Sequence, residues 1–392
     1  MSMLATRHRR CDRNEGSPCR AAAYHRRVDV ARFGVRVATG IRDVLTGAKA
    51  LKAIDDKGFW AIVMTFDGEL TAVRFANVSH DSQMPRAPWT GLDRGWRSSL
   101  DGDAYRSAVA EIRERIAAGT VYQVNLCRIL EQDLDESADL DGLDVVLRQG
   151  NPAPYACRIR VDAAGLDVVS ASPERFLTRA GTTLRSSPIK GTATAADRLL
   201  PKDVAENVMI VDLVRNDLSR VCHEGTVDVE ALCAVEAHPG LVHLVSTVAG
   251  RLRPRVGWSE IFDATFPPGS VSGAPKSSAL TTIRDLEPAP RGPYCGAIGW
   301  VDADRDEADL AVGIRTFWAA RDVSGRRVLR FGTGAGITWG SDPAAEWTET
   351  ELKATRLVGL ASSSSDNGWL GAEGTGAAAV TTWSSGRPLR AR

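Results

Sequence analysis

The chain of 392 residues carries 49 basic and 49 acidic side chains, so its formal net charge is zero. This balance excludes overall electrostatic attraction to nucleic acid or anionic lipid as the basis of its function. The 43% of hydrophobic and 25% of charged residues are typical of a globular protein with a large core. No apolar run reaches the roughly 18 residues that span a bilayer, and no secretory signal is evident, so we expect a cytoplasmic protein.

The two ends of the chain lack the pattern of a folded core. Residues 1–32 hold eight arginines against three acids, and residues 361–392 are rich in Ser, Gly and Ala. Segments of such composition bury too little apolar surface to fold. We therefore expect both ends to be disordered and the folded unit to extend over residues 33–360. For residues 1–32, a start codon assigned too early is an alternative.

Between these ends, helix and strand patterns are mixed. Residues 59–75 predict two strands joined at Asp67-Gly68, which is a strong hairpin signal. Residues 103–119 predict an amphipathic helix, because apolar residues recur at helical spacing and the segment has signals for both helix ends.

Three further patterns complete the folded unit. Residues 166–192 predict three strands, residues 205–221 predict a second helix, and residues 295–340 predict an antiparallel meander of three or four strands. The glycine-rich segment 332–340 belongs to this meander and does not form the first turn of a βαβ unit, which argues against a dinucleotide site.

The cysteines predict neither disulfides nor a zinc site. Their number is odd and they contain no C-x-x-C pair, and the six histidines show no metal-binding spacing. We expect reduced thiols throughout. The seven positions are Cys11, Cys19, Cys127, Cys157, Cys222, Cys233 and Cys295.

Two acidic pairs suggest a metal site. Asp203 and Glu206 are three residues apart in the predicted second helix, and Glu346 and Glu349 repeat this spacing after Asp342-Pro343, a common helix opening. Two such helical faces would offer several hard oxygen ligands of the kind that Mg²⁺ prefers. A simpler interpretation stays open, because acids in a first helical turn also stabilise the helix dipole.

Eight motifs, in uninterrupted order over about residues 100–360, resemble those of the chorismate-utilising enzymes, and most closely those of component I of aminodeoxychorismate synthases. The motifs are SPERF (172–176), PIKGT (188–192), AENVMIVDLVRNDLSRV (205–221), HLVST (243–247), FPPGSVSGAPK (266–276), YCGAIGW (294–300), AVGIRTF (311–317), and GAGI (334–337) followed by EWTETELKA (346–354). The resemblance implies a large α/β (α+β) unit of antiparallel sheets flanked by helices, with the active site in the central cleft.

The same resemblance implies how chorismate is bound. Glu206 and Glu349 correspond to direct ligands of Mg²⁺, with Asp203 and Glu346 in support. The positions expected around the ring and its carboxylate are Gly191, Thr192, His243, Gly334 and Gly336. The positions expected at the enolpyruvyl carboxylate are Tyr294 and Arg315, with Lys353 nearby. For His243, a hydrogen-bonded core histidine is an alternative.

Two residues carry the chemistry that the resemblance implies. Lys190, as a free amine, attacks C2 of the ring while Glu174 protonates the departing 4-hydroxyl; ammonia then attacks C4 and expels the lysine. Glu174 must be protonated for this role, so burial should raise its pKa; an exposed glutamate paired with Arg175 is the alternative. Gln123 stands where isochorismate synthases have a lysine that activates water, and anthranilate synthases usually have alanine in place of Lys190.

The implied product is 4-amino-4-deoxychorismate, for 4-aminobenzoate and folate synthesis or for secondary metabolism. The chain contains no G-x-C-x-G element of a class I glutaminase. We therefore expect ammonia from a separate glutamine amidotransferase subunit, or free ammonium. Two other interpretations stay open: component I of an anthranilate synthase, and a non-catalytic chorismate-binding homologue.

Overall fold

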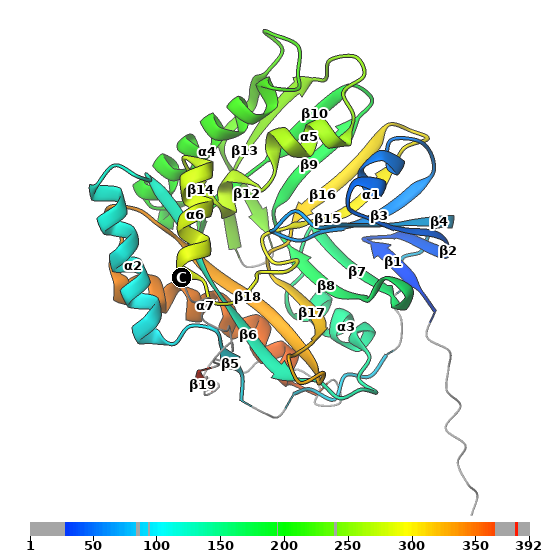
Figure 1. Cartoon of the computed structure of the whole chain (residues 1–392), viewed down its shortest axis with the longest axis horizontal. Coiled ribbons are helices and arrows are strands. Elements are labelled where there is room, and N and C mark those ends of the chain that lie inside the picture. The colour runs from blue at the N-terminus through cyan, green and yellow to red at the C-terminus, as the bar shows by residue number, and fades with distance from the viewer. Residues whose placement is uncertain are drawn as a thin grey trace, which may run out of the picture.

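The computed structural model describes residues 28–83, 87–92, 95–193, 195–238, 241–364 and 381–382. Helices flank strands that pair mainly antiparallel, which confirms the predicted fold class (Figure 1). The α-helices are α1 (Gly47–Ala53), α2 (Gly102–Ala117), α3 (Leu140–Gly150), α4 (Pro201–Ser219), α5 (Trp258–Thr265), α6 (Lys276–Leu286) and α7 (Pro343–Ser362). None of these helices has the length and apolar composition needed to cross a membrane.

The strands are β1 (Val30–Phe33), β2 (Arg36–Thr46), β3 (Phe59–Met64), β4 (Leu70–His80), β5 (Arg97–Ser98), β6 (Gln123–Asp133), β7 (Tyr155–Val161), β8 (Leu166–Ser172), β9 (Arg175–Ala180), β10 (Thr183–Ser187), β11 (Ile189–Ala193), β12 (Asp228–His238), β13 (Leu241–Arg251), β14 (Gly273–Ala274), β15 (Ala297–Asp302), β16 (Glu307–Val312), β17 (Thr316–Arg321), β18 (Arg327–Ile337) and β19 (Thr381–Thr382). Three short 3₁₀ helices span Asp162–Ala164, Ala196–Arg198 and Gly269–Val271.

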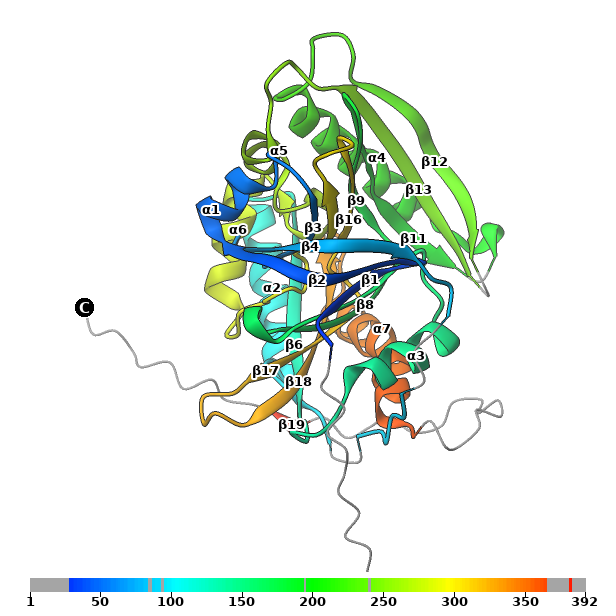
Figure 2. The ribbon, with the colours of Figure 1, turned by 90° about the vertical axis from the view of Figure 1, so that its right-hand side faces the viewer.

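Antiparallel pairing links most strands into one continuous ladder. Its order is β12, β13, β10, β9, β16, β15, β3, β4, β2, β1, β7, β8, β17, β18, β6. Strand β11 also pairs with β13, and β14 and β5 pair with β6. In Figure 2, β12 and β13 lie toward the upper right and the β17–β18 hairpin lies toward the bottom.

Local signals place several elements where the sequence predicts them. Gly68, with φ 88°, turns the hairpin of β3 and β4. Asp342 caps α7 ahead of a proline in its first turn, as the sequence predicts. Helix α2 begins at Gly102, just before the predicted start at residue 103, and its cap is Asp101, whose side chain accepts from the Ala104 N–H at 2.8 Å. A cap needs only neighbouring residues, which is why these ends can be read from the sequence.

The limits expected for the folded unit were too narrow. Residues 30–32 of the supposed arm belong to β1, which pairs with both β2 and β7, and α7 continues to Ser362 inside the supposed tail. The backbone of β1 is satisfied by the strands on its two sides, so a weak apolar pattern suffices there. Residues 1–27 and most of 365–392 lie outside the described part of the chain.

The predicted meander over residues 295–340 was also wrong in its connectivity. It consists of two hairpins, β15–β16 and β17–β18, that pair with different neighbours: β16 joins β9 and β17 joins β8. Between them the chain crosses at residues 313–315. A Cβ atom at Gly313 would lie 2.1 Å from the Pro293 carbonyl oxygen, and Arg315 adopts φ 52°, so tertiary packing determines the crossing.

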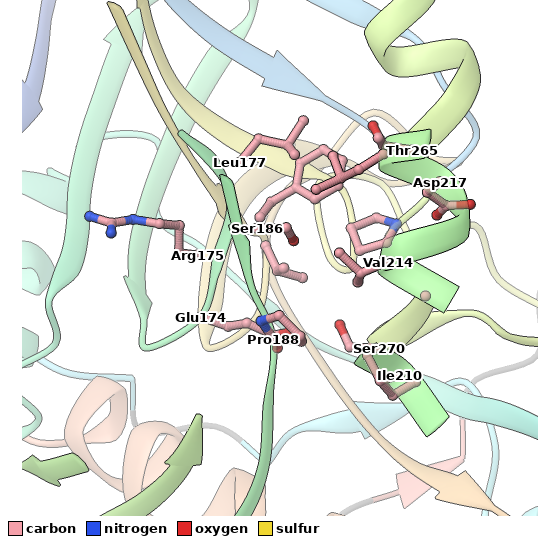
Figure 3. Close-up of a pocket in the computed structure, with 15 residues that line it drawn as sticks. Glu174, Arg175, Leu177, Ser186, Pro188, Ile210, Val214, Asp217, Thr265 and Ser270 are labelled. Carbon is pink, nitrogen blue, oxygen red and sulfur yellow. The ribbon is translucent and has the colours of Figure 1, made fainter. Parts of the chain in front are cut away.

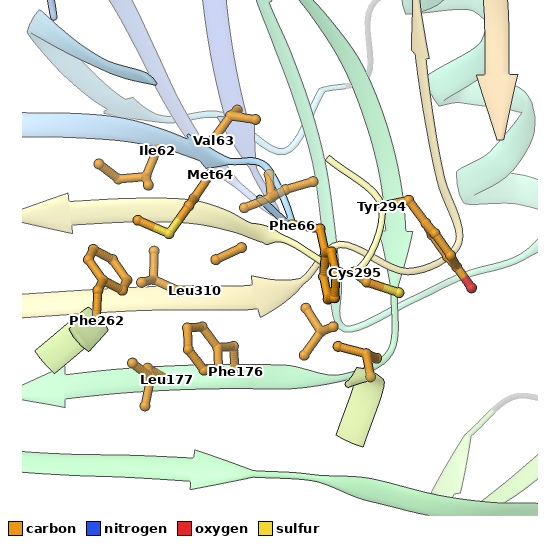
Figure 4. Packing of buried hydrophobic residues seen from close by; sticks show 14 of the residues in the cluster. Ile62, Val63, Met64, Phe66, Phe176, Leu177, Phe262, Tyr294, Cys295 and Leu310 are labelled. Carbon is orange, nitrogen blue, oxygen red and sulfur yellow. The ribbon is translucent and has the colours of Figure 1, made fainter. Parts of the chain in front are cut away.

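The main hydrophobic core fills the space between the β3–β15–β16–β9 strands and α5 (Figure 4). Phe262 of α5 and Phe176 and Leu177 of β9 belong to this core, and a second cluster is buried under α3 and α7. The five cysteines within the described ranges are free thiols, as expected, whereas Cys11 and Cys19 lie outside those ranges.

Candidate active site

Lys190 is largely buried on β11. Its side chain is 14% exposed, and its Nζ lies 3.9 Å from Glu206 Oε2 of α4. The Nζ also donates to the carbonyl oxygen of Ser270 at 3.3 Å. The amine is therefore held between a helix and the loop that contains Ser270, and it is not a solvated side chain at the end of a strand.

Glu174 lies between β8 and β9 and is only 4% exposed. Burial raises the pKa of its carboxyl, against the opposing effects of the Ser270 hydroxyl, Lys190 and the Ile189 N–H. Arg175 is ion-paired with Asp309, with Nε 3.3 Å from Oδ1, and points away from Glu174 in Figure 3. The alternative of an exposed glutamate paired with Arg175 is thus excluded, and the raised pKa suits a proton donor.

Ser270 links these two groups, although the sequence did not single it out. Its carbonyl oxygen accepts from Lys190, and its hydroxyl favours the ionised form of Glu174. Ser270 and Glu174 also line a pocket of about 20 Å³, whose wall includes Ile210 and Val214 of α4 (Figure 3). The only available sequence signal was its place inside the FPPGSVSGAPK motif.

Gly191 brings β11 against the start of α4. Its φ is 76°, and a Cβ atom there would lie 2.8 Å from Cβ of Asp203. Asp203 Oδ2 accepts from the Leu200 N–H at 2.9 Å, so this carboxylate caps its own helix. Thr192 follows in β11 opposite His243 of β13, and His243 is 2% exposed.

The remaining carboxylates come from two helices and influence one another. Burial raises the pKa of Glu206 on α4 and of Glu346 on α7, and the charge of Glu349 raises both further. Glu346 accepts from the Ser341 hydroxyl at 2.6 Å, and Glu349 pairs with Lys353 at 2.6 Å. The pKa of Glu349 is lowered on balance. Burial raises it, but Lys353 and other nearby lysines together lower it more.

These carboxylates fit a magnesium ion by their chemistry. Within the described residues, no three acidic, histidine or cysteine side chains converge on one point. Mg²⁺ does not require such a cage, because it is usually held by one or two carboxylates together with waters and an anionic substrate. Glu206 and Glu349 are the residues that would hold it.

The glycines of β18 allow a close approach to the site. A Cβ atom at Gly336 would lie 2.6 Å from Gln123 Nε2 and 3.8 Å from Glu206 Oε2. The Gly334 carbonyl oxygen accepts from Lys353 Nζ at 3.1 Å. Gln123 is 2% exposed, and its Oε1 has no hydrogen-bond partner within the described residues.

Arg315 is a partly buried cation at the crossing between β16 and β17. Among the described residues its guanidinium has no hydrogen-bond acceptor, whereas the neighbouring Arg356 donates to the Gly150 carbonyl at 2.5 and 2.9 Å. Burial and the charge of Arg356 both lower the pKa of Arg315. Two neighbouring guanidiniums of which one lacks an acceptor are suited to bind a carboxylate.

Tyr294 lies in the hydrophobic core (Figure 4) and is 5% exposed. A Cβ atom at Gly332 would lie 2.1 Å from its ring. Burial, and then the neighbouring thiols of Cys127 and Cys295, raise the pKa of Tyr294 well above its usual value. The structure therefore brings Lys190, Glu174 and Glu206 together, and it surrounds Tyr294 with core side chains.

Known proteins resemble the chain in sequence and in fold. A family model described as chorismate binding enzyme matches residues 64–359. Anthranilate synthase component 1 of Streptomyces coelicolor is 39% identical over 71% of this chain and 55% of its own length. Aminodeoxychorismate synthase component 1 of Escherichia coli is 32% identical over 76% of this chain and 68% of its own length. The match with this chain therefore covers only 55% and 68% of the length of these two relatives.

One solved structure shows the shared fold. Anthranilate synthase component I from Streptococcus pneumoniae superposes with a TM-score of 0.71 at 20% identity, over 90% of this chain and 95% of that one. Identity at this level supports a conclusion about the fold alone. The relatives by sequence are divided between two activities, so their names do not distinguish these activities for this chain.

Proposed function

The chain belongs to the chorismate-binding enzyme family, and from this premise we propose that it is component I of an aminodeoxychorismate synthase. The observation that carries the proposal is the position of Lys190 and Glu174 on either side of Ser270. A buried amine and a carboxyl whose pKa is raised supply the two groups that replacement of the 4-hydroxyl requires.

The proposed reaction proceeds in two displacements. Lys190 Nζ forms a bond to C2 of chorismate, both ring double bonds shift by one position, and the C4–O bond breaks. Glu174 gives its proton to the departing oxygen, which leaves as water. Ammonia then forms a bond to C4, the C2–N bond breaks, and its electron pair returns to Lys190. One proton of the added ammonia restores Glu174, so the net change is chorismate plus ammonia to 4-amino-4-deoxychorismate plus water.

Other residues bind and orient the substrate in this proposal. Arg315, together with Lys353 and the hydroxyl of Tyr294, takes the enolpyruvyl carboxylate. Gly191, Thr192, Gly334 and Gly336 let backbone groups approach the ring carboxylate, and His243 lies along the ring. When bound, Mg²⁺ at Glu206 and Glu349, supported by Asp203 and Glu346, would offset the negative charge of that carboxylate.

The nitrogen source is a separate protein in this proposal. Ammonia would come from a glutamine amidotransferase subunit, since the sequence lacks a glutaminase nucleophile motif. High concentrations of ammonium should replace that subunit. Consumption of glutamine by the purified chain alone would contradict this assignment.

The decisive experiment is incubation of the purified chain with chorismate, Mg²⁺ and ammonium. We expect an aminated product that retains the enolpyruvyl group and that a lyase converts to 4-aminobenzoate. A second candidate is favoured by the relative from Streptomyces coelicolor, which is named anthranilate synthase component 1. Release of fluorescent anthranilate without a lyase would establish that alternative and overturn the first.

A further inference from the structure

Asn207 is fully buried on α4, one residue after Glu206. Its Nδ2 donates to the Leu244 carbonyl oxygen at 3.1 Å, and its Oδ1 accepts a short hydrogen bond from the Ser246 hydroxyl. Leu244 and Ser246 both belong to β13. One carboxamide therefore attaches the helix to two positions of a single strand.

Those two positions of β13 also hold the segment that carries Lys190. Leu244 lies opposite Lys190 in the antiparallel register, and the Ser246 N–H donates to the Pro188 carbonyl oxygen at 3.1 Å. Asn207 thus connects the helix that bears Glu206 to the strand that supports Lys190.

The network around Ser246 fixes the direction of its hydroxyl. The Cys233 N–H donates to Ser246 Oγ at 2.8 Å, at a bulge of β12 where Cys233 has φ 52°. Because this oxygen already accepts from Cys233, its proton is free to be donated to Asn207. The carboxamide is then oriented at both ends, with Nδ2 toward Leu244 and Oδ1 toward Ser246. Apolar packing between α4 and β13 alone would not define such an orientation.

We propose that Asn207 is a positioning residue, which fixes α4 to β13 and so sets the separation between the Lys190 amine and the Glu206 carboxylate. The inference rests on the proposed function. A displacement of about 1 Å at reacting groups can cost roughly 10²-fold in rate. Loss of Asn207 should therefore reduce turnover more than it reduces binding of chorismate, because Arg315 lies at the crossing between β16 and β17 and not on α4 or β13.

The test compares Asn207→Ala with Thr282→Ala in the full chain with chorismate, Mg²⁺ and ammonium. Thr282 is also buried and hydrogen-bonded, to Arg115 at 3.2 Å, but it lies on α6. We expect kcat of Asn207→Ala to fall roughly 10- to 100-fold while KM for chorismate changes less than about threefold. For Thr282→Ala we expect kcat within about threefold of the unaltered chain. Rates are divided by the concentration of folded protein, which is determined by circular dichroism.

A second variant keeps the inference testable if Asn207→Ala does not fold. Ser246→Ala retains the carboxamide but removes the hydroxyl that orients it, and kcat should again fall, by about threefold or more, with KM unchanged. If kcat of Ser246→Ala or of Asn207→Ala equalled that of Thr282→Ala, the role of Asn207 would be overturned, while the proposed function would stand. Absence of any aminated product from the unaltered chain would overturn the proposed function, and the inference with it.

Discussion

The two walls of the site hold their charged side chains in different ways. On the wall formed by β11, α4, the turn between β8 and β9 and the loop around Ser270, Glu174 is 4% exposed and the Lys190 side chain 14%. On the wall formed by α7, Glu349 and Lys353 pair with each other and have side chains that are 41% and 52% exposed. Burial makes each charge costly and therefore sensitive to its partners, whereas exposed pairs are screened by water. The contrast suggests that chemistry belongs to the first wall and adjustable binding to the second.

The largest expected effect is on the buried wall. In Lys190→Ala, the aminated product should fall to the detection limit, because no amine remains to form the covalent intermediate. Lys190→Arg is the matched control, since it keeps the positive charge but supplies no nucleophile at working pH. Product formation by both variants is measured by chromatography and mass spectrometry. Recovery of activity in Lys190→Arg would mean that Lys190 acts only through its charge.

Next in size is the loss of the acid. Glu174→Gln should lower kcat roughly 10²- to 10⁴-fold, because glutamine cannot donate the proton that the departing oxygen needs. The affinity for chorismate, measured by fluorescence quenching or calorimetry, should change little. A rate close to that of the unaltered chain would remove Glu174 from the mechanism.

Loss of Arg315, the cation proposed to bind the enolpyruvyl carboxylate, should give a smaller effect of a different kind. Arg315→Ala should raise KM for chorismate about 10- to 100-fold, since a charge-assisted carboxylate contact is lost. Arg321→Ala serves as the control, because Arg321 is an exposed arginine paired with Glu136 and lies outside the site. If both variants had the same KM, Arg315 would not hold the substrate.

Burial of Glu174 should also be visible as a pH-dependent cost in stability. A carboxyl whose pKa is raised on folding destabilises the fold as pH rises from its unfolded pKa through its folded one. Glu174→Gln removes that cost, so its melting temperature should exceed that of the unaltered chain by about 2 °C or more at pH 7. The difference should shrink toward pH 4. A difference that does not depend on pH would show that folding does not raise the pKa of Glu174.

The smallest effect should come from the exposed pair. Lys353→Met should change the free energy of unfolding by only about 0.5 kcal/mol or less, since i,i+4 ion pairs at surfaces contribute that much. Urea denaturation at low and high salt provides the measurement. A loss of several kcal/mol would show that this exposed pair stabilises the fold far more than exposed ion pairs usually do.

Local signals predicted the elements, and long-range contacts decided what the sequence missed. The turn at Gly68 and the cap at Asp342 depend on adjacent residues alone, so both were predictable. The crossing before Arg315 depends on β8 and β9, which lie far away in the sequence. Ser270 contributes a carbonyl oxygen and Asn207 a carboxamide, and neither residue type signals such a contact before the fold is known.

The strand ladder has a consequence for how activity arises during synthesis. Helix α4, which carries Glu206, packs at the β12–β13 end, and β18, which carries Gly336, lies near the other end; a Cβ atom at Gly336 would lie 3.8 Å from Glu206 Oε2. A nascent chain that has already folded around Lys190 therefore lacks the opposite wall until β18 and α7 have been made. We therefore expect no activity from a nascent chain before β18 and α7 have been synthesised. A ligand that contacts both walls holds them together, so saturating chorismate should raise the melting temperature.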